Sequence, residues 1–124
     1  MADVSARAWR PEAPSPVAAD VAEPMARQAA SFLAASVAGE IDGARMGSVH
    51  VLATPDAGRV YAGAVVTGPL RAYVATVLGP GGHATHKYIV SYPDAAAAQA
   101  ALDALLVRQE SEGYAAIGTV DGDA

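Results

Sequence analysis

The side chains best suited to metal or acid–base chemistry are three histidines, His50, His83 and His86. The last two fall three residues apart at the start of a predicted strand, and that spacing points them to opposite faces, which suits a shared metal ion poorly. His50 would be a third ligand, with Asp56 or Glu40 as a speculative fourth. The pattern favours polar residues on a solvated strand, so we expect no metal site and no cofactor.

The glycine-rich run at residues 79–82 has the composition of a phosphate-binding loop without its context. Such a loop needs a helix after it, so that the helix N-terminus meets the phosphate, and here a strand is predicted to follow. A hairpin turn is therefore favoured. Ser91 and Thr85 lie near His86, but no nucleophile elbow or oxyanion loop accompanies them. We expect no catalytic residues and a protein that is not an enzyme.

Tyrosines on predicted strands, with basic residues nearby, form the best candidate for a binding surface. Tyr88 and Tyr92 are an even number of residues apart and so share a face of their strand. If that face is open, it suits stacking on bases or gripping a peptide; if the first helix covers it, the tyrosines belong to the core. The predicted partner-binding residues are Trp9, Arg59, Tyr61, Arg71, Tyr73, Lys87 and Tyr88.

Composition narrows the class of protein. The 124 residues suit one domain, and the formal charge of −5 with scattered basic residues disfavours binding to nucleic acid. The chain has no cysteine, which excludes disulfides, thiolate zinc sites and cysteine nucleophiles. No apolar run reaches the ~18 residues of a membrane span. We expect a cytoplasmic protein that does not enter a membrane.

The N-terminal quarter is predicted to contain an arm and a helix. Residues 1–16 hold three prolines, which favour an extended arm, either a disordered leader or a segment that docks on a neighbour through Trp9. Residues 17–124 are predicted to form a single domain. Apolar residues at three- and four-residue steps predict a helix over residues 20–40, with its regular part beginning at Glu23 or Pro24.

From residue 47 the apolar period changes to two, which predicts strands joined by short turns and therefore antiparallel neighbours. Pro93 then ends the last strand of the run, Asp94 caps a helix, and Gly113 suits the left-handed residue after it. The fold class is α+β: a four-stranded antiparallel meander packed by the C-terminal helix, with an additional N-terminal helix beside it. The predicted strands are 48–53, 59–67, 70–78 and 83–92, followed by the helix 95–112, a short strand 115–120 and a solvated tail 121–124.

The stretch from Ala72 to Tyr114 resembles a WGR domain. It has a strand, a glycine-containing turn at residues 78–82, a strand that ends in an aromatic residue, and an alanine-containing helix closed by Gly-Tyr. The resemblance covers about forty residues and implies a small antiparallel sheet with one helix.

In the DNA-dependent poly-ADP-ribose polymerases of that family, the Trp and Arg of the turn help to contact a broken DNA end. Here Leu78 and Pro80 stand at those positions and only Gly79 is retained. Leucine cannot stack on a base as an indole does, and proline cannot pair with phosphate. The resemblance is therefore to a degenerate WGR domain, with the implied DNA binding weakened.

These observations predict a non-catalytic protein-interaction or assembly module. Its partner would be a protein, a larger assembly or a second copy of the chain, contacted through the N-terminal arm and the open sheet face. The alternative is a nucleic-acid-binding WGR-like domain that uses Arg59, Arg71, Lys87 and the tyrosines. A small enzyme or metal protein with a histidine-centred site is the third hypothesis.

Overall fold

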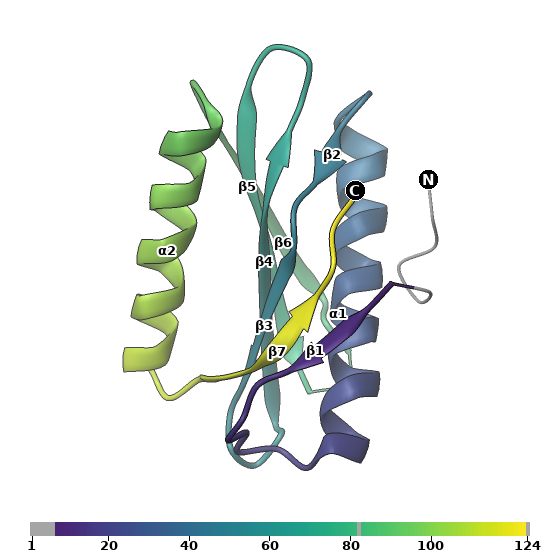
Figure 1. The fold of residues 1–124 in the computed structure, drawn as a ribbon, viewed down its shortest axis with the longest axis vertical. Helices are drawn as coiled ribbons and strands as arrows, with labels where there is room; N and C mark the ends of the chain where they lie inside the picture. The colour runs from purple at the N-terminus through teal and green to yellow at the C-terminus, as the bar shows by residue number, and fades with distance from the viewer. Residues whose placement is uncertain (1–6, 82, 124) are drawn as a thin grey trace.

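A computed structural model describes residues 7–81 and 83–123 of the chain. Within these residues, a seven-stranded antiparallel sheet lies between two helices, α1 (Ala19–Glu40) and α2 (Ala95–Ser111), which cover opposite faces (Figure 1). The predicted α+β class is confirmed. The predicted four-stranded sheet is too small, and α1 covers the second face instead of lying beside α2. Neither described helix has the length and hydropathy of a membrane span.

The strands follow the order β1-β7-β3-β4-β5-β6, and β2 pairs with β4 beside this path. The run from β3 to β6 is the predicted meander. The chain then crosses one face as α2 and returns beside β3 as β7, so β6 and β1 lie at opposite ends of the path. The strands are β1 (Trp9–Pro11), β2 (Arg45–Met46), β3 (Val49–Ala53), β4 (Arg59–Thr67), β5 (Ala72–Pro80), β6 (His86–Tyr92) and β7 (Ala115–Val120).

Alternation of side chains along the strands divides the interior into two cores. The smaller core lies under α2, where Ala98 and Leu102 pack on Ala72 and Val74. The larger core lies under α1, where half of the buried residues of the helix are alanine, so the helix can approach the sheet closely. Strand residues that face α1 are Val49, Val51, Ala53, Val60, Ala62, Ala64, Val66, Ala75, Val77, Ile117 and Val120.

The ends of α2 follow the sequence prediction, whereas the start of α1 does not. Asp94 caps α2 by accepting a 2.8 Å hydrogen bond from the Ala97 N–H, and Gly113 after it has φ of +102°. In contrast, α1 begins at Ala19 with no side-chain cap, and Pro24 lies inside it. Packing of the alanine-rich face on the sheet therefore extends this helix beyond the start that proline suggested.

The segment compared with the Trp-Gly-Arg turn is a strand in this protein. Leu78, Gly79 and Pro80 pair with residues 59–61 of β4, so the predicted turn at residues 78–82 begins too early. A side chain at Gly79 would lie 2.7 Å from the Thr85 backbone nitrogen. Glycine is needed there because the next segment folds closely back over the strand.

The N-terminal arm and the C-terminal tail hold each other against the sheet. Trp9 on β1 is half-buried against the α1 core, so it docks within its own chain, where the sequence suggested a neighbour or a leader. Residues 1–6 lie outside the described residues. The tail was expected to be solvated, but Asp121 binds Arg10 through two hydrogen bonds of 2.8 and 3.1 Å, and Asp123 binds Arg7. These ion pairs add to the backbone pairing of β1 with β7, which also joins the two ends of the described chain.

Candidate interaction surface

The predicted aromatic surface is divided between the two faces of the sheet. In the register of β4 and β5, Tyr61 lies opposite Leu78 and Tyr73 lies opposite Val66. Tyr73 packs with Val66 in the core under α1, so it faces α1. Tyr61 lies on the α2 face, is only 4 % exposed, and stacks edge-to-face on Tyr114 with ring centroids 6.1 Å apart. Burial raises the pKa of the Tyr61 phenol, so this side chain is a neutral part of the core.

The three basic residues predicted to bind a partner lie at three separate places. Arg59 donates a 3.2 Å hydrogen bond to the Tyr114 hydroxyl beside a cavity of about 430 Å³ at the end of α2. Arg71 donates to Ser91 Oγ at 3.4 Å, and Lys87 Nζ lies 3.3 Å from a Glu40 carboxylate oxygen at the end of α1. They do not form one cationic surface.

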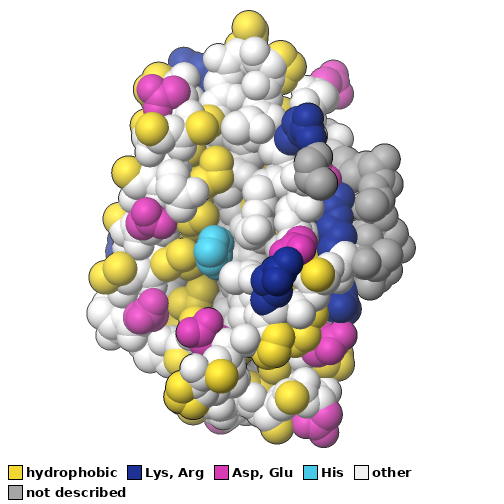
Figure 2. Space-filling view, viewed as in Figure 1, with side chains coloured by type: hydrophobic (Ala, Val, Ile, Leu, Met, Phe, Trp, Pro, Cys, Tyr) yellow, Lys and Arg dark blue, Asp and Glu magenta, His cyan; other side chains and the backbone are white. Residues whose placement is uncertain are grey.

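Other basic side chains gather beside β1 and α1, where acidic side chains are interspersed among them (Figure 2). Arg7 pairs with Asp123 and Arg10 with Asp121, and Arg27 Nε lies 3.0 Å from Glu23 Oε2. Pairing of this kind neutralises the charge that a phosphate backbone would otherwise attract.

The three histidines are not brought together. His50 pairs with Gly63 on β4 and Thr119 on β7, whereas His86 begins β6 and so lies three strands away along the path. His86 Nδ1 lies 3.0 Å from Thr85 Oγ1. In residues 7–81 and 83–123, no group of three or more His, Cys, Asp or Glu side chains is placed to hold a metal ion.

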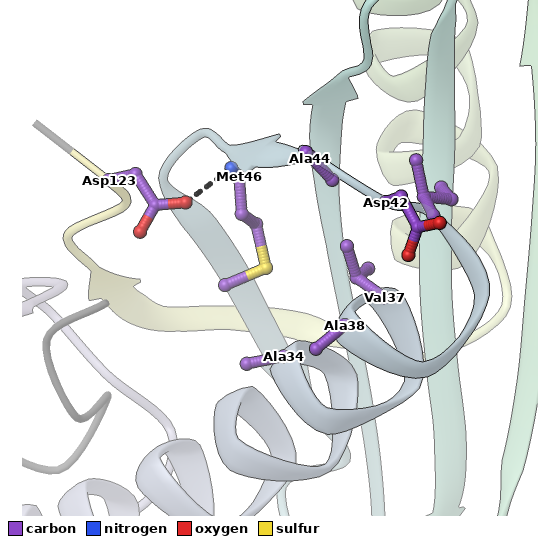
Figure 3. A pocket seen from close by; sticks show the side chains of 9 residues that line it. Ala34, Val37, Ala38, Asp42, Ala44, Met46 and Asp123 are labelled. Carbon is purple, nitrogen blue, oxygen red and sulfur yellow. Dashed lines mark hydrogen bonds between the residues drawn. The ribbon is translucent and has the colours of Figure 1, made fainter.

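A small recess at the end of α1 is lined mainly by apolar side chains, including Val37 and Met46 (Figure 3). Its volume is about 220 Å³, room for one apolar side chain. At its rim, Asp123 Oδ2 accepts a 2.7 Å hydrogen bond from the Met46 N–H and the Asp123 N–H donates to the Met46 carbonyl at 2.7 Å. This carboxylate therefore fastens the C-terminal segment to β2.

The ionised form of Asp123 is favoured in the folded protein. Burial opposes the charge, but the Met46 N–H and Arg7 outweigh it and hold the pKa of Asp123 below its usual value. A carboxyl with a depressed folded pKa stabilises the fold above its unfolded pKa of about 3.9, and this contribution is lost as pH falls through the folded value.

An Asp123→Asn variant should therefore lose about 2 kcal/mol of unfolding free energy at pH 7, because it removes charge-assisted hydrogen bonds. The difference from the wild type should shrink below about pH 4. Denaturant unfolding of the variant and the wild type at pH 7 and below about pH 4 measures this difference in unfolding free energy. Asp121→Asn is the matched control, since its ion pair with Arg10 is exposed and its loss should be smaller. Equal stability of Asp123→Asn and wild type at pH 7 would contradict this role.

Among the strands in residues 7–81 and 83–123, β6 carries the most exposed large apolar side chains. It ends the strand order, and α2 packs over β4 and β5 beside it. Tyr88 is 56 % exposed and Val90 51 % exposed, and both lie on the α2 face, opposite Thr76 and Val74. Tyr88 was predicted as a site residue. Val90 was missed, although its position in the last strand of the meander was a usable signal.

Hydrogen bonds at the two ends of β5 fix which way its backbone points. The Gly68 N–H donates to the Arg71 carbonyl at 2.8 Å across the turn to β4, and the Thr85 N–H donates to the Leu78 carbonyl at 3.1 Å next to β6. Bonding direction alternates along an antiparallel strand. The even-numbered residues of β5 therefore direct their N–H and C=O groups towards β6.

The same alternation separates the residues of β6 into two sets. Tyr88 and Val90 lie opposite even-numbered residues of β5 and direct their backbone groups inward. Lys87, Ile89 and Ser91 consequently direct their N–H and C=O groups away from the sheet. We call this outward backbone, together with the side chains of Tyr88 and Val90, the β6 surface.

Comparison of the chain with protein-family models, curated proteins and solved structures found no match.

Proposed function

We propose that the protein is a non-catalytic interaction module that binds an extended protein segment along the β6 surface. The observation that carries this proposal is an edge strand whose outward backbone groups lie beside two half-exposed apolar side chains, Tyr88 and Val90. Main-chain hydrogen bonds to an added strand would supply affinity, and the two side chains would supply selectivity.

The composition of the strand supports this proposal over binding to nucleic acid. Residues 86–92 include one lysine and no carboxylate, and that lysine, Lys87, is paired with Glu40. Strand edges that are protected against pairing commonly carry several charges, a proline or a bulge, and residues 86–92 carry only the single charge of Lys87. The cations that would recognise phosphate are dispersed: Arg59 faces α2, whereas Arg71 and Lys87 are bound to Ser91 and Glu40.

A photo-crosslinking amino acid at position 88 tests the proposal in the native host. We expect covalent protein adducts from this position and few from the same amino acid at Gln99, an exposed residue on α2. Adducts should disappear when Ser91 is also changed to proline, because proline lacks the N–H that Ser91 directs outward. Equal adduct yields at positions 88 and 99, or adducts that survive the proline, would refute the interaction at β6.

A further inference from the structure

We infer that the segment bound at the β6 surface is β6 of a second copy of this chain, paired antiparallel about a two-fold axis at Ile89. This inference rests on the proposed function and names its partner. Its starting point is the arrangement of the strand itself. Ile89 directs its backbone outward, and the exposed apolar residues Tyr88 and Val90 flank it on either side.

The two-fold register follows from that arrangement. With Ile89 opposite its own copy, Lys87 lies opposite Ser91, and all three residues present outward N–H and C=O groups to one another. Tyr88 then lies opposite Val90 of the second copy in a pair without mutual backbone bonds, where side chains approach most closely. Every residue of β6 gains a partner, because residues 86 and 92 also face each other.

The side chains gain complementary neighbours in this register. Because the axis is perpendicular to the sheet, residues on the α2 face of one copy stay on the α2 face of the other. Two Tyr88 rings and two Val90 side chains therefore form one apolar cluster between the α2 helices, and aromatic pairs with β-branched residues are favourable across strands. A shift of the axis by two residues would leave one end of each strand unpaired and place Tyr88 away from Val90.

Charge does not oppose this pairing. Residues 86–92 contain no acidic side chain, so the net charge of −5 is not concentrated at the β6 surface. Lys87 of one copy lies opposite Ser91 of the other, so the two Lys87 side chains are separated by four residues, or about 13 Å along the strand. Each Lys87 is also bound to Glu40 of its own copy. That spacing exceeds the Debye length of about 8 Å at physiological ionic strength.

One strand pair and four apolar side chains make a small interface. We therefore expect a reversible dimer with a dissociation constant on the order of 10 µM, near the weak end of specific protein complexes. The joined sheet would be continuous through both copies, with each α1 on one side and each α2 on the other.

Sedimentation equilibrium of the full chain tests the inference at concentrations from about 1 µM to about 1 mM. Wild type should pass from monomer to dimer across this range. Ser91→Pro should remain monomeric, because it removes an outward N–H and places a ring at the edge without removing a bond to β5. Ser91→Ala is the matched control and should dimerise like wild type, since both variants lose the contact with Arg71.

A second pair of variants keeps the test informative if Ser91→Pro does not fold. Val90→Glu leaves the backbone intact and places a carboxylate in the apolar cluster, so dimerisation should weaken at least about tenfold. Leu70→Glu, at an apolar residue 93 % exposed in the β4–β5 turn, should change nothing. The inference is overturned if wild type stays monomeric, or if Val90→Glu dimerises as well as Leu70→Glu.

These outcomes separate the inference from the proposed function. A monomeric wild type that still gives crosslinks from position 88 to another protein would leave the interaction module standing and remove the second copy as its partner. A dimer insensitive to both β6 substitutions, together with no crosslinks from position 88, would remove both.

Discussion

A Gly118→Ala variant is expected to release β1 from the sheet and to lose about 3 kcal/mol of unfolding free energy. Gly118 has φ of +151°, and a methyl group there would lie 2.5 Å from the Arg10 carbonyl oxygen and against the Trp9 ring. Trp9 and Arg10 belong to β1, which pairs with β7 at Gly118. They therefore cannot move away from the added methyl group without breaking the pairing of the two strands.

Tryptophan fluorescence and denaturant unfolding measure this effect. Trp9 is the one tryptophan of the chain, so its emission reports directly on the docking of β1 and should shift to longer wavelength in the variant. Gly113→Ala is the matched control: φ there is +102°, but no atom lies within 4 Å of the added methyl group. It should cost about 1 kcal/mol and leave the emission unchanged. Unshifted emission in Gly118→Ala would show that β1 is not held as described.

A Leu102→Ala variant should lose about 3 kcal/mol, because it empties the centre of the core under α2. Leu102 is 1 % exposed and packs over Gly63, where an added methyl group would lie 2.9 Å from the Leu102 Cδ1 atom. Thermal or denaturant unfolding gives the loss. Val107→Ala, at a residue 68 % exposed on the same helix, is the control and should be nearly neutral.

A double variant sharpens this test. Gly63→Ala adds a methyl group that collides with Leu102 in the wild type but enters the space left by Leu102→Ala. The double variant should therefore lose less unfolding free energy than the sum of the losses of the two single variants, with a coupling energy of about 1 kcal/mol. Strict additivity would contradict direct packing of Leu102 on Gly63.

The local elements could be predicted from the sequence because their signals are short-range. Strand β4 and strand β7 match the predicted ranges 59–67 and 115–120, and α2 ends one residue before the predicted boundary. Asp94 as a cap and Gly113 as a left-handed residue depend only on their immediate neighbours. These positions needed no knowledge of the distant chain.

Long-range pairing was the part that the sequence did not reveal. The bonding of β1 to β7 and the ion pair of Arg7 with Asp123 join segments that are far apart in the sequence. A strand as short as β1 is too short to show an apolar periodicity, so the sequence gives no signal for it. The placement of α1 on the face opposite α2 depends on the same long-range pairing, because β7 contributes residues to the sheet face that α1 covers.

The candidate site was predicted in part, and register explains the remainder. Tyr61 and Tyr73 would share a face if the turn between β4 and β5 had one residue more or fewer; the observed register places Thr67 opposite Ala72 and separates them. Tyr88, a predicted site residue, lies on the β6 surface. Val90 could be recognised as part of a candidate surface only from the strand order, which places β6 at the edge of the sheet.

Amide hydrogen exchange along β6 tests the central claim most directly. In a dimer paired about Ile89, the N–H groups of Lys87, Ile89 and Ser91 should exchange rapidly at about 1 µM protein and become protected at about 1 mM. The N–H groups of Tyr88 and Val90 face β5 and should be protected at both concentrations. Exchange at residues 87, 89 and 91 that is equally rapid at both concentrations would contradict pairing of β6 with a second copy.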